Sequence, residues 1–134
     1  MKKVFLIFLL SFILNVVWEN LHSFLYAGYM GGKITEFILL RASVVDAAVI
    51  TLLSLPFIFV PNLREKSWLI MVTGVLIAIG IELYALNTGR WAYNEYMPMV
   101  PLLGIGLTPA IQLGLLGHLS YRLVMGNLEL RNAF

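Results

Sequence analysis

The chain of 134 residues contains no cysteine, and acidic and basic residues together make up only 12% of it. Without cysteine it can form neither a disulfide nor a thiolate metal site, and it has no cysteine nucleophile. It also lacks any basic run interleaved with aromatic residues, which counts against nucleic acid as a partner. The net charge of +2 therefore needs another explanation.

Apolar residues are abundant instead. They make up 60% of the chain and give it a mean hydropathy of +0.90, well above the range of soluble domains. A span needs ~20 apolar residues to cross the ~30 Å hydrocarbon core, which leaves room for about four spans and for no separate soluble domain. We therefore predict one all-α domain over residues 1–134, a multi-pass protein of the cell membrane surrounded by membrane lipids.

Four apolar runs predict the spanning helices, at about residues 4–26, 38–60, 68–86 and 102–124. The first run also fits the apolar part of a signal peptide. However, the segment Asn15-Val16-Val17-Trp18-Glu19 offers no small-x-small cleavage site, so we expect an uncleaved helix. The start of the fourth helix has two interpretations: either Thr108 caps a helix that begins at Pro109, or a longer helix is kinked at Pro109.

Lysine and arginine predict the orientation, because cytoplasmic loops carry an excess of them. With the N-terminus inside, the cytoplasmic set is Lys2, Lys3, Arg64, Lys66, Arg122 and Arg131. The outer set is Lys33, Arg41 and Arg90. The larger cytoplasmic set predicts a four-helix bundle with both termini in the cytoplasm and with the loops 27–37 and 87–101 outside.

Polar side chains inside the predicted spans gather in the outer half of this bundle. They are Glu19, His22, Arg41, Asp46, Glu82, Thr108 and Gln112. An ionisable group in a span costs ~2.5–3.5 kcal/mol on insertion scales, so each needs a partner, water or a function. We predict a polar pocket open to the outer leaflet, formed by Glu19, His22, Asp46, Glu82, Arg90, Tyr93 and Gln112.

The carboxylates in this cluster have two open uses. In the first they form structural ion pairs with arginine, namely Glu19 with Arg41 or Arg90, Asp46 with Arg90, and Glu82 with Arg41. In the second, one of the three carboxylates lacks a cation and serves as a general acid or proton carrier. The candidate catalytic residues are therefore Glu19, Asp46 and Glu82.

One stripe of the first helix carries Asn15, Glu19 and His22 at i, i+4 and i+7, and Tyr26 continues it at i+11. Glu19-x-x-His22 has the spacing by which a helical bundle can offer two metal ligands. The chain has no second such motif, so we predict no metal and no cofactor. His22 is instead a candidate ligand-binding residue, as is Gln112 on the fourth helix.

The loop after the third helix combines Arg90, Trp91 and Tyr93. Tryptophan and tyrosine there are typical of the aromatic belt at a membrane interface. Alternatively the loop is a lid, in which Arg90 binds phosphate or carboxylate and the aromatic rings stack on a planar or isoprenoid chain. On that interpretation Arg90, Trp91 and Tyr93 are ligand-binding residues.

Small residues at Gly106, Ala110 and Gly114 form a ladder that favours close helix packing. Two uses are open: packing within one bundle, or association of two copies into a homo-oligomer.

The segment Gly89-Arg90-Trp91-Ala92-Tyr93-Asn94 is followed by an apolar interval with prolines and then by a new helix. It resembles the Gly-x-Trp-x-Phe-Asn segment of the small membrane-embedded lycopene cyclase domains, over about a quarter of the chain. The resemblance implies a helical membrane domain with a lipid or isoprenoid ligand. In that family two adjacent acids after the proline protonate the polyene, whereas here Ala110, Ile111 and Gln112 follow Pro109.

Together these patterns predict an enzyme that binds or modifies a lipid or isoprenoid by acid/base chemistry. A carboxylate would donate the proton, and Arg90 with Trp91 would hold a hydrophobic small molecule. Two alternatives stay open, a small proton-coupled transporter and a non-catalytic membrane subunit.

Overall fold

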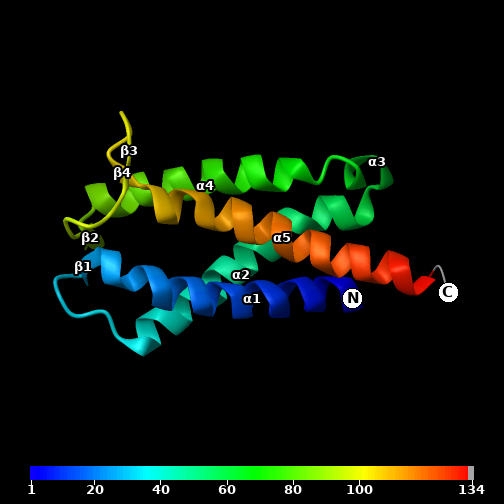
Figure 1. Ribbon diagram of the computed structural model, residues 1–134, viewed down its shortest axis with the longest axis horizontal. Helices are drawn as coiled ribbons and strands as arrows, with labels where there is room; N and C mark the ends of the chain where they lie inside the picture. The colour runs from blue at the N-terminus through cyan, green and yellow to red at the C-terminus, as the bar shows by residue number, and fades with distance from the viewer. Residues whose placement is uncertain (133–134) are drawn as a thin grey trace.

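The computed structural model describes the backbone of residues 1–132 and the side chains of residues 1–126. Four long helices account for most of it (Figure 1). They are α1 Lys2–His22, α2 Glu36–Phe59, α4 Trp68–Asn87 and α5 Leu107–Asn132. A 3₁₀ turn, η1 Ser23–Leu25, follows α1, and the short helix α3 Pro61–Arg64 joins α2 to α4.

Local chemistry explains where two of these helices begin and end. Thr35 caps α2, because its Oγ1 accepts a hydrogen bond from the Ile38 backbone N–H at 3.4 Å. The helix ends just before Pro61, whose ring cannot continue it. At the end of α4 the chain turns through Gly89 at φ +66°, a conformation that glycine adopts without strain.

The helices run along the length of an elongated molecule (Figure 1). Both ends of the chain and α3 lie at one end, which we call the α3 end. All four strands lie at the opposite end, which we call the strand end. The helices α2 and α4 meet near α3 and diverge toward the strand end.

Two short antiparallel strand pairs close the strand end. β1 Tyr26–Tyr29 pairs with β2 Trp91–Tyr93, and β3 Met99–Val100 pairs with β4 Ile105–Gly106. The sequence pattern predicts only helices and loops, with Tyr26 on the stripe of the first helix. That placement was wrong, because the chain leaves α1 after His22 and pairs with a segment far along the sequence, which no local pattern reveals.

The start of α5 lies close to the first interpretation of the fourth helix, although Thr108 lies within the helix and does not cap it. The helix begins at Leu107, so Thr108 and Pro109 occupy its first turn, where the missing N–H of proline costs nothing. The longer helix from residue 102 was wrong. The apolar segment before Leu107 forms the β3–β4 hairpin instead, with Leu102 at φ +70° and Gly104 at φ +66° in its turn.

Helix α5 occupies the middle of the bundle and packs against α1, α2 and α4. Its contact with α4 is very close at Gly74 and Gly114, where an added Cβ on Gly114 would lie 2.3 Å from the Met71 carbonyl oxygen. The ladder residues Gly106, Ala110 and Gly114 are all buried within the single chain. A homo-oligomer built on them stays a prediction, and it would require the α4–α5 contact to open.

Several of the fully buried side chains are polar, whereas the outer surface of the bundle is apolar. Ser11, Asn15, Ser43, Ser54 and Ser120 are fully buried. Large apolar side chains cover the outer faces of the helices, among them Phe5, Leu21, Phe37, Leu52 and Leu76. Water would not solvate such an outer surface favourably, whereas lipid chains would.

Three helices are long and apolar enough to cross a membrane: α1 extended through η1 to Leu25, α2, and α4. The prediction of a mainly helical chain is confirmed, and so is the presence of helices that could cross a membrane. In the part of the chain that the structure describes, α5 does not reach the same apolar content. Polar side chains along α5 explain this, among them the buried Gln112 and the exposed Arg122.

Candidate functional site

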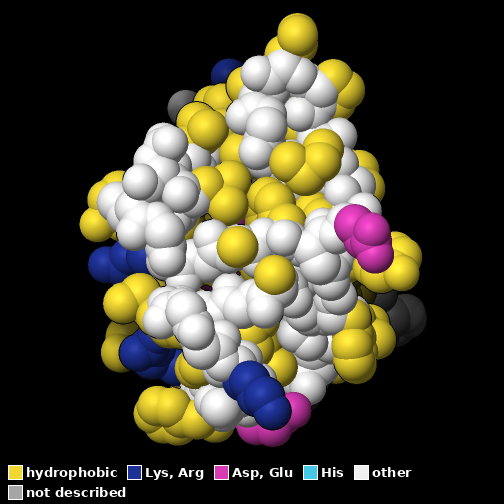
Figure 2. Space-filling view, turned by 90° about the vertical axis from the view of Figure 1, so that its left-hand side faces the viewer, with side chains coloured by type: hydrophobic (Ala, Val, Ile, Leu, Met, Phe, Trp, Pro, Cys, Tyr) yellow, Lys and Arg dark blue, Asp and Glu magenta, His cyan; other side chains and the backbone are white. Residues whose placement is uncertain are grey.

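A cavity of about 470 Å³ lies at the strand end, where α2 and α4 diverge. Residues of α1, α2, α4 and α5 line it, together with residues of β1 and β2. The lining residues Val45 on α2 and Ile81 on α4 are 54% and 40% exposed, so the cavity is accessible from the side, between these two helices. Figure 2 shows the strand end, where hydrophobic side chains outnumber the few charged ones.

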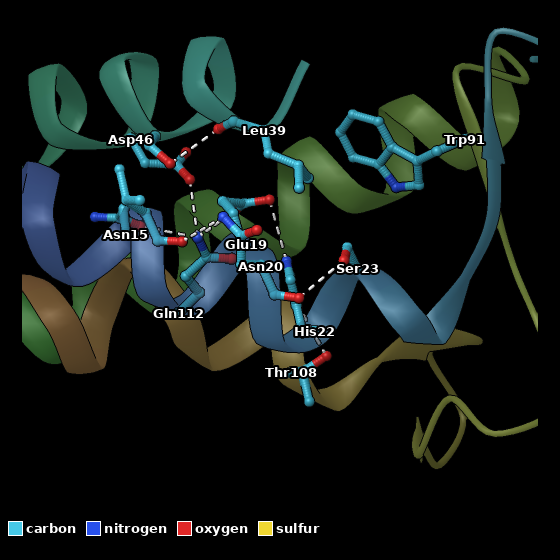
Figure 3. A network of polar contacts seen from close by, with 12 residues as sticks. Asn15, Glu19, Asn20, His22, Ser23, Leu39, Asp46, Trp91, Thr108 and Gln112 are labelled. Atoms are coloured by element: carbon cyan, nitrogen blue, oxygen red, sulfur yellow. Dashed lines mark hydrogen bonds and ion pairs between the residues drawn. The ribbon is translucent and has the colours of Figure 1, made fainter. Parts of the chain in front are cut away.

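Gln112 lies at the centre of the polar wall of this cavity (Figure 3). Its Nε2 contacts three oxygens: Asn15 Oδ1 at 2.8 Å, Glu19 Oε1 at 2.6 Å and Asp46 Oδ2 at 2.9 Å. Gln112 is only 4% exposed, so these contacts are shielded from bulk solvent. One amide nitrogen therefore ties α5 to both α1 and α2.

Three oxygens surround the side-chain nitrogen of Gln112, which has fewer hydrogens than that to donate. An amide NH₂ group carries two hydrogens, so they cannot give each oxygen a full hydrogen bond of its own. Glu19 and Asp46, which lie on different helices, thus direct one carboxyl oxygen each at the same amide nitrogen. A proton on either carboxyl would complete this set of hydrogen bonds.

His22 extends the network from Glu19 to α5. Its Nε2 lies 3.2 Å from Glu19 Oε2, and its Nδ1 lies 3.4 Å from Thr108 Oγ1. The ring packs edge-on against Tyr26, with 5.2 Å between ring centroids. The histidine thus joins the carboxyl pair to the aromatic side of the cavity.

The third carboxyl, Glu82 of α4, is held by the loop that follows its helix. Glu82 Oε2 accepts a hydrogen bond from Trp91 Nε1 at 3.1 Å and another from the Tyr93 hydroxyl. Both donors belong to β2, and pairing with β1 holds this strand over the cavity. Tyr26 of β1 packs edge-on against both rings, at 6.4 Å from Trp91 and 5.3 Å from Tyr93.

The two tyrosines beside Glu82 stay neutral. Burial raises the pKa of Tyr26 far above its ordinary value of 10.0, and the nearby Glu82 carboxylate raises it further. Burial also raises the pKa of Tyr93, and its hydrogen bond to Glu82 adds to the effect. Both phenols therefore keep their protons at physiological pH, and Tyr93 remains a hydrogen-bond donor.

Arg41 and Arg90, whose side chains the structure describes, do not pair with the carboxyl groups, and the ion pairs considered for Glu19, Asp46 and Glu82 are wrong. Within the side chains that the structure describes, the one ion pair joins Glu19 to His22. Arg41 Nη2 donates to the Tyr29 hydroxyl at 2.6 Å, and its guanidinium lies 5.6 Å from the centroid of that ring.

Arg90 makes a similar contact on the other side of the cavity, where its guanidinium lies 5.4 Å from the centroid of the Tyr84 ring. Cation–π contacts of this kind leave the guanidinium N–H groups accessible. Both arginines are exposed, and both line the cavity.

No set of metal ligands forms around the Glu19-x-x-His22 motif. Among the residues described, no three histidine, aspartate or glutamate side chains lie together in a way that could hold a metal ion. The carboxyl groups of the cavity contact amide, phenol, indole and imidazole groups instead.

The structure brings the predicted site residues together from all four long helices and β2. Those that line the cavity are Glu19, His22, Asp46, Glu82, Arg90, Trp91 and Gln112. Tyr93 is not among the lining residues and acts through Glu82. Sequence reasoning gave no role to Tyr29 and treated Arg41 only as an ion-pair partner. Their positions depend on β1 pairing with β2, for which the sequence carries no clear signal.

Comparison of the chain with protein-family models, with curated proteins and with solved structures found no match. The case for a function therefore depends on the side chains of the cavity themselves.

Proposed function

We propose that the chain is an integral membrane protein with four spanning helices and both termini in the cytoplasm. Three helices of sufficient length and apolar content support this, as does the apolar outer surface of the bundle. We count α5 as the fourth span. It has 26 residues, and two of its polar side chains, Gln112 and Ser120, are buried inside the bundle.

We further propose that the protein is an enzyme that acts on a lipid or isoprenoid by acid/base chemistry. One observation carries the proposal: Glu19, Asp46 and Glu82 converge on a single cavity, and none of them pairs with a described lysine or arginine. Carboxyl groups that only fixed helix register would be expected to have such partners. This arrangement therefore favours proton transfer over a purely structural role.

The Glu19–Asp46 pair is the proposed proton donor. A proton shared between the two carboxyls would complete the hydrogen bonds around Gln112, and the donor would remain hydrogen-bonded after giving the proton up. Glu82 is the proposed acceptor. Protonation of a substrate double bond by the pair and loss of a different proton to Glu82 would rearrange the substrate without changing its composition.

The walls of the cavity suit an unsaturated apolar chain. Ile38, Ala42 and Leu113 provide apolar surface, and the rings of Tyr26 and Trp91 provide aromatic faces. Access between α2 and α4 would let such a chain enter from the membrane without crossing water.

A proton-coupled transporter has less support. It needs a path to both sides of the membrane, usually with its site near the midplane. Here the acids gather at the strand end, and the α3 end is filled by a core that includes Ile50, Phe57, Ile70, Leu116 and Tyr121. A non-catalytic subunit is also less favoured, because the ion pairs that would give the carboxyls a structural role are missing from the described residues.

Solvent isotope incorporation tests the proposed chemistry. The full chain, purified in a neutral maltoside detergent, would be incubated in D₂O with the lipid extract of the membranes that contain it. We expect mass spectrometry to find one extracted lipid that gains deuterium at carbon. Asp46→Asn and Glu82→Gln should abolish this gain, because neither amide can transfer the proton.

Glu65→Gln is the matched control, since this exposed acid lies in the turn at the α3 end. It should leave incorporation unchanged. If no lipid gains carbon-bound deuterium with the wild-type chain, or if Asp46→Asn retains the full rate, the proposed function is wrong.

A further inference from the structure

The rim of the cavity carries a positive charge on each side. Arg41 extends from the first turns of α2, and Arg90 lies just before β2. Both line the same cavity, and both are exposed. Neither forms an ion pair with any described carboxylate, although Glu19, Asp46 and Glu82 line that cavity too.

Contacts with tyrosine hold these guanidinium groups without using most of their donors. A guanidinium has five N–H groups. Arg41 donates one hydrogen bond to the Tyr29 hydroxyl at 2.6 Å, and the Arg90 guanidinium lies against the Tyr84 ring. Most of the donors on both side chains therefore remain available to an anion.

The cavity changes character from its rim inward. Ala78 and Leu113 contribute buried apolar wall. The exposed Val45 and Ile81 lie at the side entrance between α2 and α4. A ligand that matches both parts has an anionic head and an apolar chain. Phosphate suits the head best, because the planar guanidinium of each arginine can bind phosphate oxygens in bidentate hydrogen bonds.

We propose that Arg41 and Arg90 bind the phosphate head group of an amphiphile whose apolar chain enters the cavity between α2 and α4. This inference deepens the proposed function, since it names the substrate class of the same cavity. The head group stays at the rim, and the chain passes beside the carboxyl groups.

Binding of four simple probes tests this class. They are dodecyl phosphate, dodecanol, dodecyltrimethylammonium and inorganic phosphate, each titrated against the full chain in a neutral maltoside detergent. Affinity would be taken from native mass spectra and from the shift in thermal melting. We expect dodecyl phosphate to bind at least about tenfold more tightly than the other three, because it alone joins a chain to an anion.

Single substitutions at the rim should weaken dodecyl phosphate selectively. Arg41→Gln and Arg90→Gln should each reduce its affinity about tenfold, and Arg41→Lys and Arg90→Lys should recover only part of it, because lysine lacks the planar fork. Lys33→Gln is the matched control, since it removes an exposed charge from the same outer region without touching the cavity lining. Its affinity should equal that of the wild type.

Three results would overturn the proposal. Dodecanol or dodecyltrimethylammonium could bind as tightly as dodecyl phosphate, both glutamine variants could keep full affinity, or inorganic phosphate alone could bind as tightly, which would indicate a site for the free ion. If a glutamine variant fails to give a monodisperse protein, the corresponding lysine variant decides, and full affinity in both lysine variants then counts against the proposal.

The two proposals can fail separately. Loss of phosphate binding in the rim variants without any deuterium incorporation by the wild type would leave the binding site standing and the acid/base function refuted. Deuterium incorporation that depends on Asp46 but not on Arg41 or Arg90 would refute the head-group site alone.

Discussion

The two ends of this bundle are built from the same four helices but have different interiors. At the α3 end, Ile50, Ile70 and Leu116 fill the space, and the Tyr121 hydroxyl donates to the Phe57 carbonyl at 2.9 Å. At the strand end, α2 and α4 diverge around a cavity that side chains with carboxyl, amide and imidazole groups line. Polar groups at the α3 end bond mainly to backbone, whereas the carboxyl groups of the cavity bond to other side chains.

This difference distinguishes polar side chains that only pack from those that form the candidate site. A polar side chain that donates to the backbone of its own or a neighbouring helix, as Ser54 does to the Ile50 carbonyl at 2.8 Å, has its hydrogen already bonded, and the burial of Ser54 keeps it from a ligand. Glu19, Asp46 and Gln112 instead depend on one another across three helices. A network of hydrogen bonds between side chains can gain or lose a proton while the backbone hydrogen bonds of the helices stay in place.

The largest expected effect concerns the close contact between α4 and α5 at Gly114. Gly114→Ala should lower the free energy of unfolding in detergent by about 3 kcal/mol, because the new methyl group would overlap the Met71 carbonyl, a backbone atom that cannot rotate away. Gly80→Ala is the matched control: nothing lies within 4 Å of an added Cβ there, so alanine should stabilise α4 by up to ~1 kcal/mol. Thermal unfolding that is the same for both variants would contradict this account of the α4–α5 contact.

The second prediction compares one buried polar residue from each end. Gln112→Leu should cost about 2–3 kcal/mol, because it removes the donor from Glu19 and Asp46 and leaves their oxygens unsatisfied. Ser120→Ala should change stability by less than about 0.5 kcal/mol, since the Ser120 hydroxyl has no hydrogen-bond partner among the described residues. Equal costs would mean that the buried polar groups at the two ends contribute equally to stability.

The third prediction concerns pH. Tyr93→Phe should destabilise the protein by about 1 kcal/mol at neutral pH, because Glu82 loses one of its two donors. The folded protein raises the pKa of Tyr93 above its unfolded value of 10.0, so the wild type loses stability as the pH rises above about 10, where only the unfolded chain releases this proton. Phenylalanine cannot ionise, and the variant should therefore lose less stability in that range.

Thermal melting between pH 8 and pH 11 measures this effect. Tyr96→Phe is the control, because Tyr96 is 74% exposed and makes no described side-chain contact with Glu82. A steeper alkaline loss in Tyr93→Phe than in the wild type would count against the hydrogen bond to Glu82.

The smallest expected effect lies in the hairpin beside the cavity. Leu102 adopts φ +70°, which costs a leucine about 1 kcal/mol relative to glycine. Leu102→Gly should therefore raise stability by somewhat less than that, because glycine also gains freedom in the unfolded chain. Leu103→Gly offers no such relief and should not stabilise. A fall in melting temperature for Leu102→Gly would show that the contacts of the leucine side chain stabilise the protein by more than its backbone strain costs.

The sequence by itself determined the helical build and its membrane character, because apolar content and helix length are local properties that need no tertiary contact. It also determined that the polar groups gather near one end, since their positions along each predicted helix already place them there. The start of α5 near Thr108 had a local signal too, in the proline of its first turn.

Only the tertiary structure decided which of these groups meet. The Gln112 network joins residues up to 97 positions apart, and Glu19 and Asp46 lie on different helices. The structure also placed Arg41 and Arg90 against tyrosine rings instead of carboxylates, and it formed the β1–β2 pairing that holds Trp91 and Tyr93 over Glu82. The physical reason is that helix rotation, helix divergence and strand pairing each depend on contacts between distant segments, and periodicity along one segment carries no information about them.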